Sequence, residues 1–97
     1  MSDSGITALD VPARLEALLF VTAEPVSPGQ LATALEVSVS AVEEGLKALE
    51  SELQTRGLRL QRHSGRVQLT TAPEAAELIE RFLGLEATSR LSRAALE

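Results

Sequence analysis

The sequence contains no cysteine, no tryptophan and no tyrosine, and its only aromatic residues are Phe20 and Phe82. Without cysteine the chain cannot form a disulfide, a Cys-ligated zinc site or a thiol nucleophile. Without Tyr and Trp it lacks the rings that most often stack on bases or anchor binding hot spots. Because 44% of the residues are nevertheless hydrophobic, we expect an aliphatic core of Leu, Val and Ala.

Positive charge is also scarce. The 97 residues include nine Lys and Arg against 14 Asp and Glu, for a formal net charge of −5. A nucleic-acid-binding domain normally shows a basic footprint, which this composition does not provide. The N-terminus has no basic segment followed by an apolar run, and no apolar stretch approaches the ~20 residues that span a bilayer. We therefore expect one small cytoplasmic domain with no membrane partner.

No pattern of catalytic residues is visible. The single histidine, His63, has no Cys, His or Asp nearby at ligand spacing, and no glycine-rich loop leads into a helix. A Ser-His-Asp triad would need a histidine placed among such partners. The sequence therefore predicts no catalytic residue, no metal, no cofactor and no small-molecule ligand, and a protein that is not an enzyme.

The first helix is predicted to begin after Asp10, which can cap it, with Pro12 in its first turn. Leu15, Leu18 and Leu19 follow at helical spacing and give the expected core stripe. On the opposite side lies a second apolar stripe: Ala13, Ala17, Phe20 and Val21. A helix that is apolar nearly all round is either central in the fold or sandwiched between the core and a partner. We favour the central position at this stage.

Two further helices are predicted at about 28–36 and 39–54. The first begins with a capping box of Ser27 and Gln30. Either Ser38 or Ser40 caps the second, and Ser40 is favoured because an acidic residue follows three positions later. The second helix also contains Gly45, which costs about 1 kcal/mol against Ala. We expect close approach by another helix to explain it.

The period then changes to two, which predicts a β-hairpin over about 58–71 with its turn at Ser64-Gly65. Centring the turn there places Leu60 opposite Leu69 and Arg62 opposite Val67. Both strands then bury the same face.

After the hairpin, Thr71 and Glu74 suggest a capping box for a last core helix, whose stripe would be Ala75, Leu78, Ile79 and Phe82. Residues 84–89 are interpreted as a linker. The order ααα-ββ-α predicts a mainly α fold with a small β-hairpin, the winged helix-turn-helix. We expect a disordered N-terminus over 1–9, the winged-helix domain over 10–83, and a linker with a truncated start of a second domain over 84–97.

The third helix occupies the position of a DNA-reading helix, but its solvent face offers Glu43, Glu44 and Glu50 with Lys47 as the only cation. Such a helix would repel phosphates, whereas DNA-reading helices present Arg or Lys to them. This argues against the first alternative, a DNA-binding transcription regulator, and no direct sequence-specific DNA binding is expected.

The hairpin is the one basic region. Arg59 and Arg66 are predicted to point outward and are weak candidates for phosphate contacts, while Arg62 lies on the buried face and extends its charged end to solvent. Two or three such contacts fall well short of the 6–10 that strong binders make. The favoured interpretation is therefore that these arginines provide solubility and pair with the acidic third helix.

Three segments resemble ScpB, segregation and condensation protein B. Residues 15–27, LEALLFVTAEPVS, are similar to the family's opening motif EALLFVAGEPV, and residues 68–74, QLTTAPE, are similar to its RLVTRPE segment. Residues 90–97, RLSRAALE, match the start of the second-domain signature LSxAALETLAIIAYxQP. The chain ends at Glu97 inside this signature, so we expect an N-terminal piece without the second winged-helix domain.

The resemblance implies a non-enzymatic subunit of the bacterial SMC–kleisin complex, which condenses and segregates chromosomes. In that family two copies pair through their N-terminal domains, and the dimer binds the kleisin ScpA, which acts with the SMC ATPase. The resemblance further implies that the kleisin contact depends heavily on the second domain. It implies a cytoplasmic protein that reaches the nucleoid through the complex.

Residues and resemblance together suggest a hypothesis for the second apolar stripe of the first helix. If that helix is not central, the stripe forms a self-association surface made of Ala13, Ala17, Phe20 and Val21. A dimer through the third helix or the hairpin is an alternative at this stage. An adaptor domain of another complex, built on the same fold, also remains open.

Overall fold

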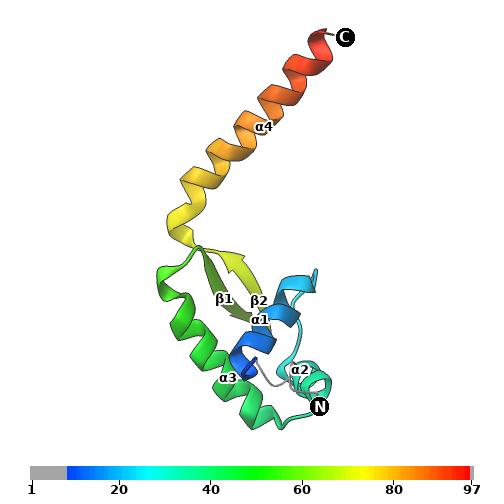
Figure 1. The fold of residues 1–97 in the computed structure, drawn as a ribbon, viewed down its shortest axis with the longest axis vertical. Helices are drawn as coiled ribbons and strands as arrows, with labels where there is room; N and C mark the ends of the chain where they lie inside the picture. The colour runs from blue at the N-terminus through cyan, green and yellow to red at the C-terminus, as the bar shows by residue number, and fades with distance from the viewer. Residues whose placement is uncertain (1–8, 97) are drawn as a thin grey trace.

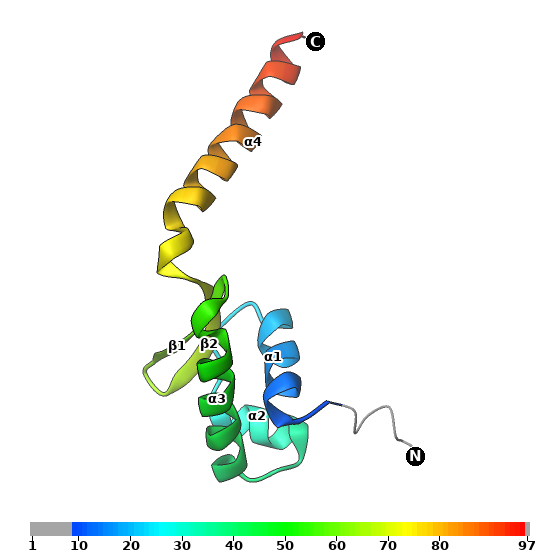
Figure 2. The ribbon, with the colours of Figure 1, turned by 60° about the vertical axis from the view of Figure 1, so that its left-hand side comes forward.

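The computed structural model describes the backbone of residues 9–96 and the side chains of residues 9–88. The predicted N-terminal segment therefore lies outside the described residues except for Leu9. The elements follow the order expected of a winged helix, with two short 3₁₀ turns added (Figures 1 and 2). Their bounds are α1 Val11–Val21, α2 Pro28–Leu35, α3 Val39–Glu52, η2 Leu53–Thr55, β1 Leu58–His63, β2 Arg66–Thr71, η3 Pro73–Ala75 and α4 Ala76–Leu96.

The core lies where α1, α2 and the hairpin meet α3. Leu15 of α1 and Leu46 of α3 are both completely buried, and the other core residues are also aliphatic. At Gly45 the two helices approach so closely that a Cβ atom would lie 2.7 Å from Cγ1 of Val11 and 2.8 Å from Cδ1 of Leu15. The expectation that a close helix explains this glycine is confirmed.

Two of the predicted helix starts are confirmed. The Asp10 carboxylate accepts the backbone N–H of Ala13 at 3.0 Å. The Ser27 hydroxyl accepts the N–H of Gln30 at 3.1 Å, and the Gln30 side chain accepts the Ser27 N–H at 2.9 Å, which completes the capping box.

The predicted cap of α3 was wrong. Ser38, and not Ser40, is the N-cap, and its hydroxyl accepts the N–H of Ala41 at 3.0 Å. The acidic residue on which the choice of Ser40 depended, Glu43, instead accepts a hydrogen bond from Arg62 at 3.0 Å. A cap at Ser38 also lengthens α3 by two residues, which adds backbone hydrogen bonds.

The hairpin has the predicted register, with Leu60 opposite Leu69 and Arg62 opposite Val67. Ser64 and Gly65 both have positive φ, 53° and 75°, as a two-residue type I′ turn requires. One contact was not predicted. Val26, in the α1–α2 connection, bridges to Val67, and each N–H donates to the other's carbonyl, at 2.9 and 2.7 Å. This bridge fastens the α1–α2 connection to the hairpin.

The C-terminal part differs most from expectation. Helix α4 continues through residues 84–89, where a linker was expected, because the segment has no proline and one glycine is tolerated at about 1 kcal/mol. It projects away from the other elements in both views (Figures 1 and 2). Leu78 and Phe82 are therefore 59% and 57% exposed and do not join the core. The placing of the domain boundary near residue 84 stays a prediction.

The capping box expected at Thr71 and Glu74 is also wrong. The segment Pro73–Ala75 forms a 3₁₀ turn, in which the Ala75 N–H donates to the Ala72 carbonyl at 2.9 Å without a side-chain cap. Glu74 is unavailable because its carboxylate accepts a hydrogen bond from Arg59. This pairing holds the base of α4 against the hairpin.

Candidate functional site

The candidate site is an open apolar groove of about 470 Å³ between α1 and the base of the hairpin. Four of its lining residues come from the second apolar stripe of α1, and the rest come from the segment before α1, the helix flank and the two strands. The lining residues are Leu9, Ala13, Glu16, Ala17, Phe20, Val21, Leu58 and Leu69. The groove thus brings together all four residues of the predicted self-association surface.

The exposure of α1 decides between the two interpretations of its sequence. Leu15 and Leu19 are buried against the core, but Phe20 and Val21 are each 75% exposed. The favoured expectation that this helix is central in the fold is therefore wrong. It packs on α3, α2 and the hairpin with one face, and no other element among residues 9–96 covers the opposite face, where Phe20 and Val21 lie.

Contiguous apolar surface of this kind is uncommon on a small domain. Scattered exposed apolar side chains are normal, whereas a patch rimmed by polar residues typically marks a binding surface. Within residues 9–88, only Glu16 contributes a charged side chain to the lining. Fully burying a Phe or Val side chain stabilises an assembly by roughly 1.5–3 kcal/mol. The groove therefore provides a driving force for association.

Besides Glu16, three apolar groove residues were not included in the predicted surface. Leu58 and Leu69 were assigned to the hairpin; they pack against the edge of the core and are only partly buried, so part of each side chain is left to line the groove. Leu9 precedes the helix, and its carbonyl accepts a hydrogen bond from Arg14 at 3.1 Å, which holds it beside α1. Period-two alternation marks Leu58 and Leu69 as inward-facing, but it cannot show where the covered area ends.

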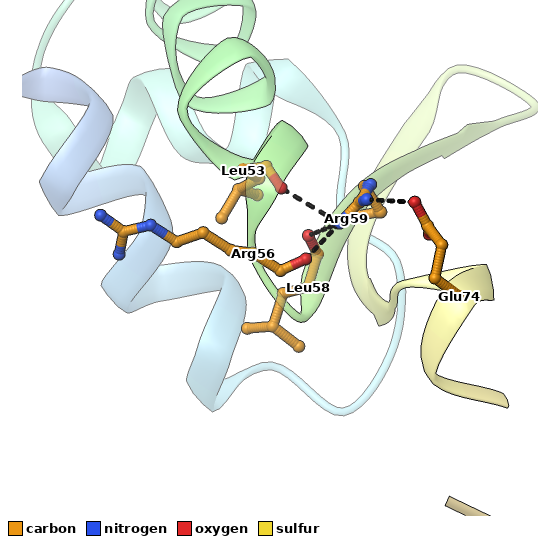
Figure 3. Close-up of polar contacts among 5 residues, drawn as sticks. All are labelled: Leu53, Arg56, Leu58, Arg59 and Glu74. Atoms are coloured by element: carbon orange, nitrogen blue, oxygen red, sulfur yellow. Dashed lines mark hydrogen bonds and ion pairs between the residues drawn. The ribbon is translucent and has the colours of Figure 1, made fainter. Parts of the chain in front are cut away.

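The structure places Arg59 differently from its predicted outward orientation (Figure 3). Its guanidinium donates to the carbonyls of Leu53, at 3.1 Å, and Leu58, at 3.0 Å, and also to that of Arg56. A further N–H donates to the Glu74 carboxylate at 3.0 Å. Arg59 thus links backbone carbonyls between the start of η2 and the start of β1 to the turn before α4, which weighs against its use as a phosphate contact.

The other two arginines of the hairpin lie nearer its turn. Arg62 pairs with Glu43 of α3 at 3.0 Å, as the expectation of pairing with the acidic helix required. Both side chains are more than a third exposed, so the pair adds about 0–1 kcal/mol at most. Arg66 is exposed and makes no side-chain hydrogen bond or ion pair with the described residues. It remains the candidate for a phosphate contact.

The face of α3 is acidic in the structure as well. Glu44 and Glu50 are exposed, and Lys47 is the only basic side chain of the helix. Within residues 9–88, no three His, Cys, Asp or Glu side chains are grouped so as to hold a metal ion. No helix in the described part of the chain has the length and apolar character needed to cross a membrane.

Fold and site together define a winged-helix domain. Its third helix, which occupies the position of a DNA-reading helix, is acidic, and its first helix borders an apolar groove. The sequence model described as "Segregation and condensation complex subunit ScpB" matches residues 13–97. The chain belongs to the ScpB family, whose named function is chromosome segregation and condensation.

Curated relatives agree with this assignment. The chain is 38% identical over 88 residues to segregation and condensation protein B of Shouchella clausii, an alignment that covers 88% of this chain and 46% of that protein. It is 42% identical over 85 residues to the protein of the same name from Desulforamulus reducens, with 86% and 46% covered. The chain thus spans about half the length of these relatives, and their names describe no enzymatic activity.

Two solved structures are similar in fold and sequence. ScpB from Mycobacterium tuberculosis matches with a TM-score of 0.75 and 32% identity over 81% of this chain and 52% of that one. A dimer of an ScpB N-terminal domain in complex with an ScpA peptide matches with a TM-score of 0.68 and 31% identity over 73% and 91%. In that structure an N-terminal domain forms a complex with an ScpA peptide. The expectation that the kleisin contact depends heavily on the second domain stays a prediction.

Proposed function

We propose that this chain is part of a non-enzymatic accessory subunit of a bacterial SMC–kleisin complex, and that its winged-helix domain pairs two copies of the protein. The observation that carries the pairing role is the uncovered face of α1, where Phe20 and Val21 are each 75% exposed beside an apolar groove. The similar N-terminal domain that forms a dimer supports it.

Partners follow from the same relative. Because that dimer binds an ScpA peptide, an ScpA-type kleisin is the proposed partner of this chain as well. The SMC ATPase would be reached through the kleisin, and the protein would work in the cytoplasm, at the nucleoid. Arg66 could add a weak phosphate contact there, but the acidic face of α3 opposes sequence-specific DNA binding.

The test is the solution mass of the chain by sedimentation equilibrium across a wide concentration range. We expect twice the chain mass, and we expect Phe20→Glu to shift the species toward the monomer. A central hot-spot residue contributes ~2 kcal/mol or more, which corresponds to about 30-fold in Kd. A charge placed in the groove would also need to be desolvated.

Val39→Glu is the matched control. Val39 is 49% exposed at the start of α3 and does not line the groove, so the same chemical change should leave the mass unaltered. Circular dichroism and thermal unfolding would verify that both variants fold. A monomer at every concentration, or an unchanged dimer in folded Phe20→Glu, would contradict the proposal.

A further inference from the structure

A second uncovered apolar surface lies on α4. Leu78, Phe82 and Leu85 follow at steps of four and three, which places them on one face of the helix. They are 59%, 57% and 64% exposed. Within residues 9–88 no other side chain covers them, so they form an apolar surface that is available for contact.

The chain itself holds α4 away from its own groove. Ala72 is buried, and its N–H donates to the Gly57 carbonyl at 2.7 Å immediately before the helix. The 3₁₀ turn η3 follows directly, and the pair between Arg59 and Glu74 links this turn to the hairpin. Helix α4 therefore leaves in a set direction, and both views show it projecting clear of α1 (Figures 1 and 2).

Each copy thus carries an apolar groove and an apolar helix face that it cannot bring together by itself. We infer that α4 of one copy lies in the groove of a second copy, with Leu78, Phe82 and Leu85 packed against Phe20 and its neighbours. This inference rests on the proposed pairing role and names the occupant of the groove.

Symmetry favours a second copy of this chain over an unrelated partner. In a two-fold dimer, a contact from helix to groove occurs twice, because the partner's helix enters the first groove in return. Both apolar surfaces of both chains are then covered by one closed arrangement. An unrelated partner in the groove would leave the α4 faces exposed.

Charge agrees with this arrangement. Among the described residues, Glu16 is the only charged side chain that lines the groove. Arg81 flanks the apolar face of α4, three residues after Leu78 and four before Leu85. An α4 helix laid along the groove can bring a cation to the rim where the groove has its one anion. Pairing across an interface of this kind chiefly fixes orientation and register.

Cysteine cross-linking tests the inference directly, because the chain has no native cysteine. Chains carrying Ala17→Cys would be mixed with differently tagged chains carrying one α4 substitution, Leu78→Cys, Phe82→Cys or Leu85→Cys. A disulfide needs Cα atoms about 4.4–6.8 Å apart, so the three positions sample about two helical turns along α4. Glu80→Cys, on the polar face of α4, is the matched control.

We expect a disulfide between the two differently tagged chains for at least one of the three apolar positions, in several-fold excess over Glu80→Cys. If the mixture yields only Ala17→Cys to Ala17→Cys disulfides at twice the chain mass, the first helices pair directly. The pairing role would then stand and the exchange of α4 would be overturned. If no cross-link forms and the chain stays monomeric, both the pairing role and the exchange of α4 are overturned.

A second measurement, which needs no cross-linking, distinguishes the pairing role of the groove from its occupation by α4. We expect Phe82→Glu to lower the solution mass as Phe20→Glu does, with the helix content kept. A dimer that survives Phe82→Glu but not Phe20→Glu would retain the groove as the dimer surface and exclude α4 as its occupant. An intrachain disulfide in a monomer carrying both Ala17→Cys and Phe82→Cys would show that α4 folds back, and would also overturn the inference.

Discussion

Gly45 of α3 faces Val11 of α1 so closely that a Cβ atom on the glycine would lie 2.7 Å from Cγ1 of the valine. Real Cβ atoms do not approach other atoms this closely, and the valine side chain is branched and has few rotamers. Glycine in a helix normally costs about 1 kcal/mol. Here it allows the close packing of α1 on α3, and this packing fixes the orientation of the groove.

Gly45→Ala is expected to destabilise the domain, although alanine favours helix. Overpacking costs typically about 1–3 kcal/mol, which the gain in helix propensity offsets only in part, so we expect a net loss of about 1 kcal/mol. Urea unfolding followed by circular dichroism measures it. Adding Val11→Ala should reduce the penalty, since a double-mutant cycle reports the contact between the two side chains.

Gly29→Ala serves as the control for that prediction. Gly29 lies in the first turn of α2, and the nearest atom to a new Cβ would be the Ser27 oxygen at an ordinary 3.8 Å. This variant should be neutral or more stable by up to ~1 kcal/mol. Equal losses of stability at Gly29 and Gly45 would mean that the close approach is not the cause.

Replacing each candidate serine tests which one caps α3: Ser38, as in the structure, or Ser40, as the sequence pattern favoured. Ser38→Ala removes the acceptor of the Ala41 N–H and should cost about 0.5–2 kcal/mol in unfolding free energy. Ser40→Ala, two residues further on, should be within about 0.5 kcal/mol of the parent chain. The reverse order of stabilities, measured under identical denaturant conditions, would restore Ser40 as the cap.

Arg59 should be more important for stability than for binding. Arg59→Lys keeps the charge but loses the planar fork that reaches three backbone carbonyls and the Glu74 carboxylate together. Because the side chain is 24% exposed and partly screened by solvent, we expect a loss of about 1–2 kcal/mol. Arg66→Lys, which breaks no internal hydrogen bond among the described residues, should leave the midpoint of unfolding unchanged.

Duplex DNA should bind weakly, with Kd no tighter than about 10⁻⁴ M at physiological salt, which is the weak end of non-specific binding. The expected cause is that Arg66 is the one arginine of the hairpin without a side-chain partner among the described residues, while Glu44 and Glu50 face solvent on α3. Fluorescence anisotropy at several salt concentrations measures this. A log–log slope much steeper than about −2 would indicate more phosphate contacts than the wing can supply.

Local patterns predicted a large part of this structure. The hairpin register follows from the alternation of Leu60, Leu69 and Val67 about a Ser-Gly turn, because a shift of one residue would turn every apolar side chain to solvent. The starts of α1 and α2 follow from side chains that cap backbone groups within three residues. Such interactions are contained within one segment, so its sequence specifies them.

The two wrong capping predictions arose where a residue had possible partners in two segments. Glu43 and Glu74 each fitted a capping box, but Arg62 and Arg59 respectively bind them across the fold. No spacing along the chain shows that an arginine from the hairpin will compete for the same carboxylate. The Val26–Val67 bridge was missed for the same reason.

The sequence by itself determined the class of the domain, its aliphatic core, and the presence of apolar stripes on the first and last helices, since periodicity and composition are properties of each helix alone. Only the tertiary structure decided which stripes are buried. Packing of α1 against Gly45 leaves Phe20 at the surface, and the fixed turn after Ala72 directs α4 away from the core. Burial depends on where neighbouring elements lie in space, and this is set by contacts between residues far apart in the chain.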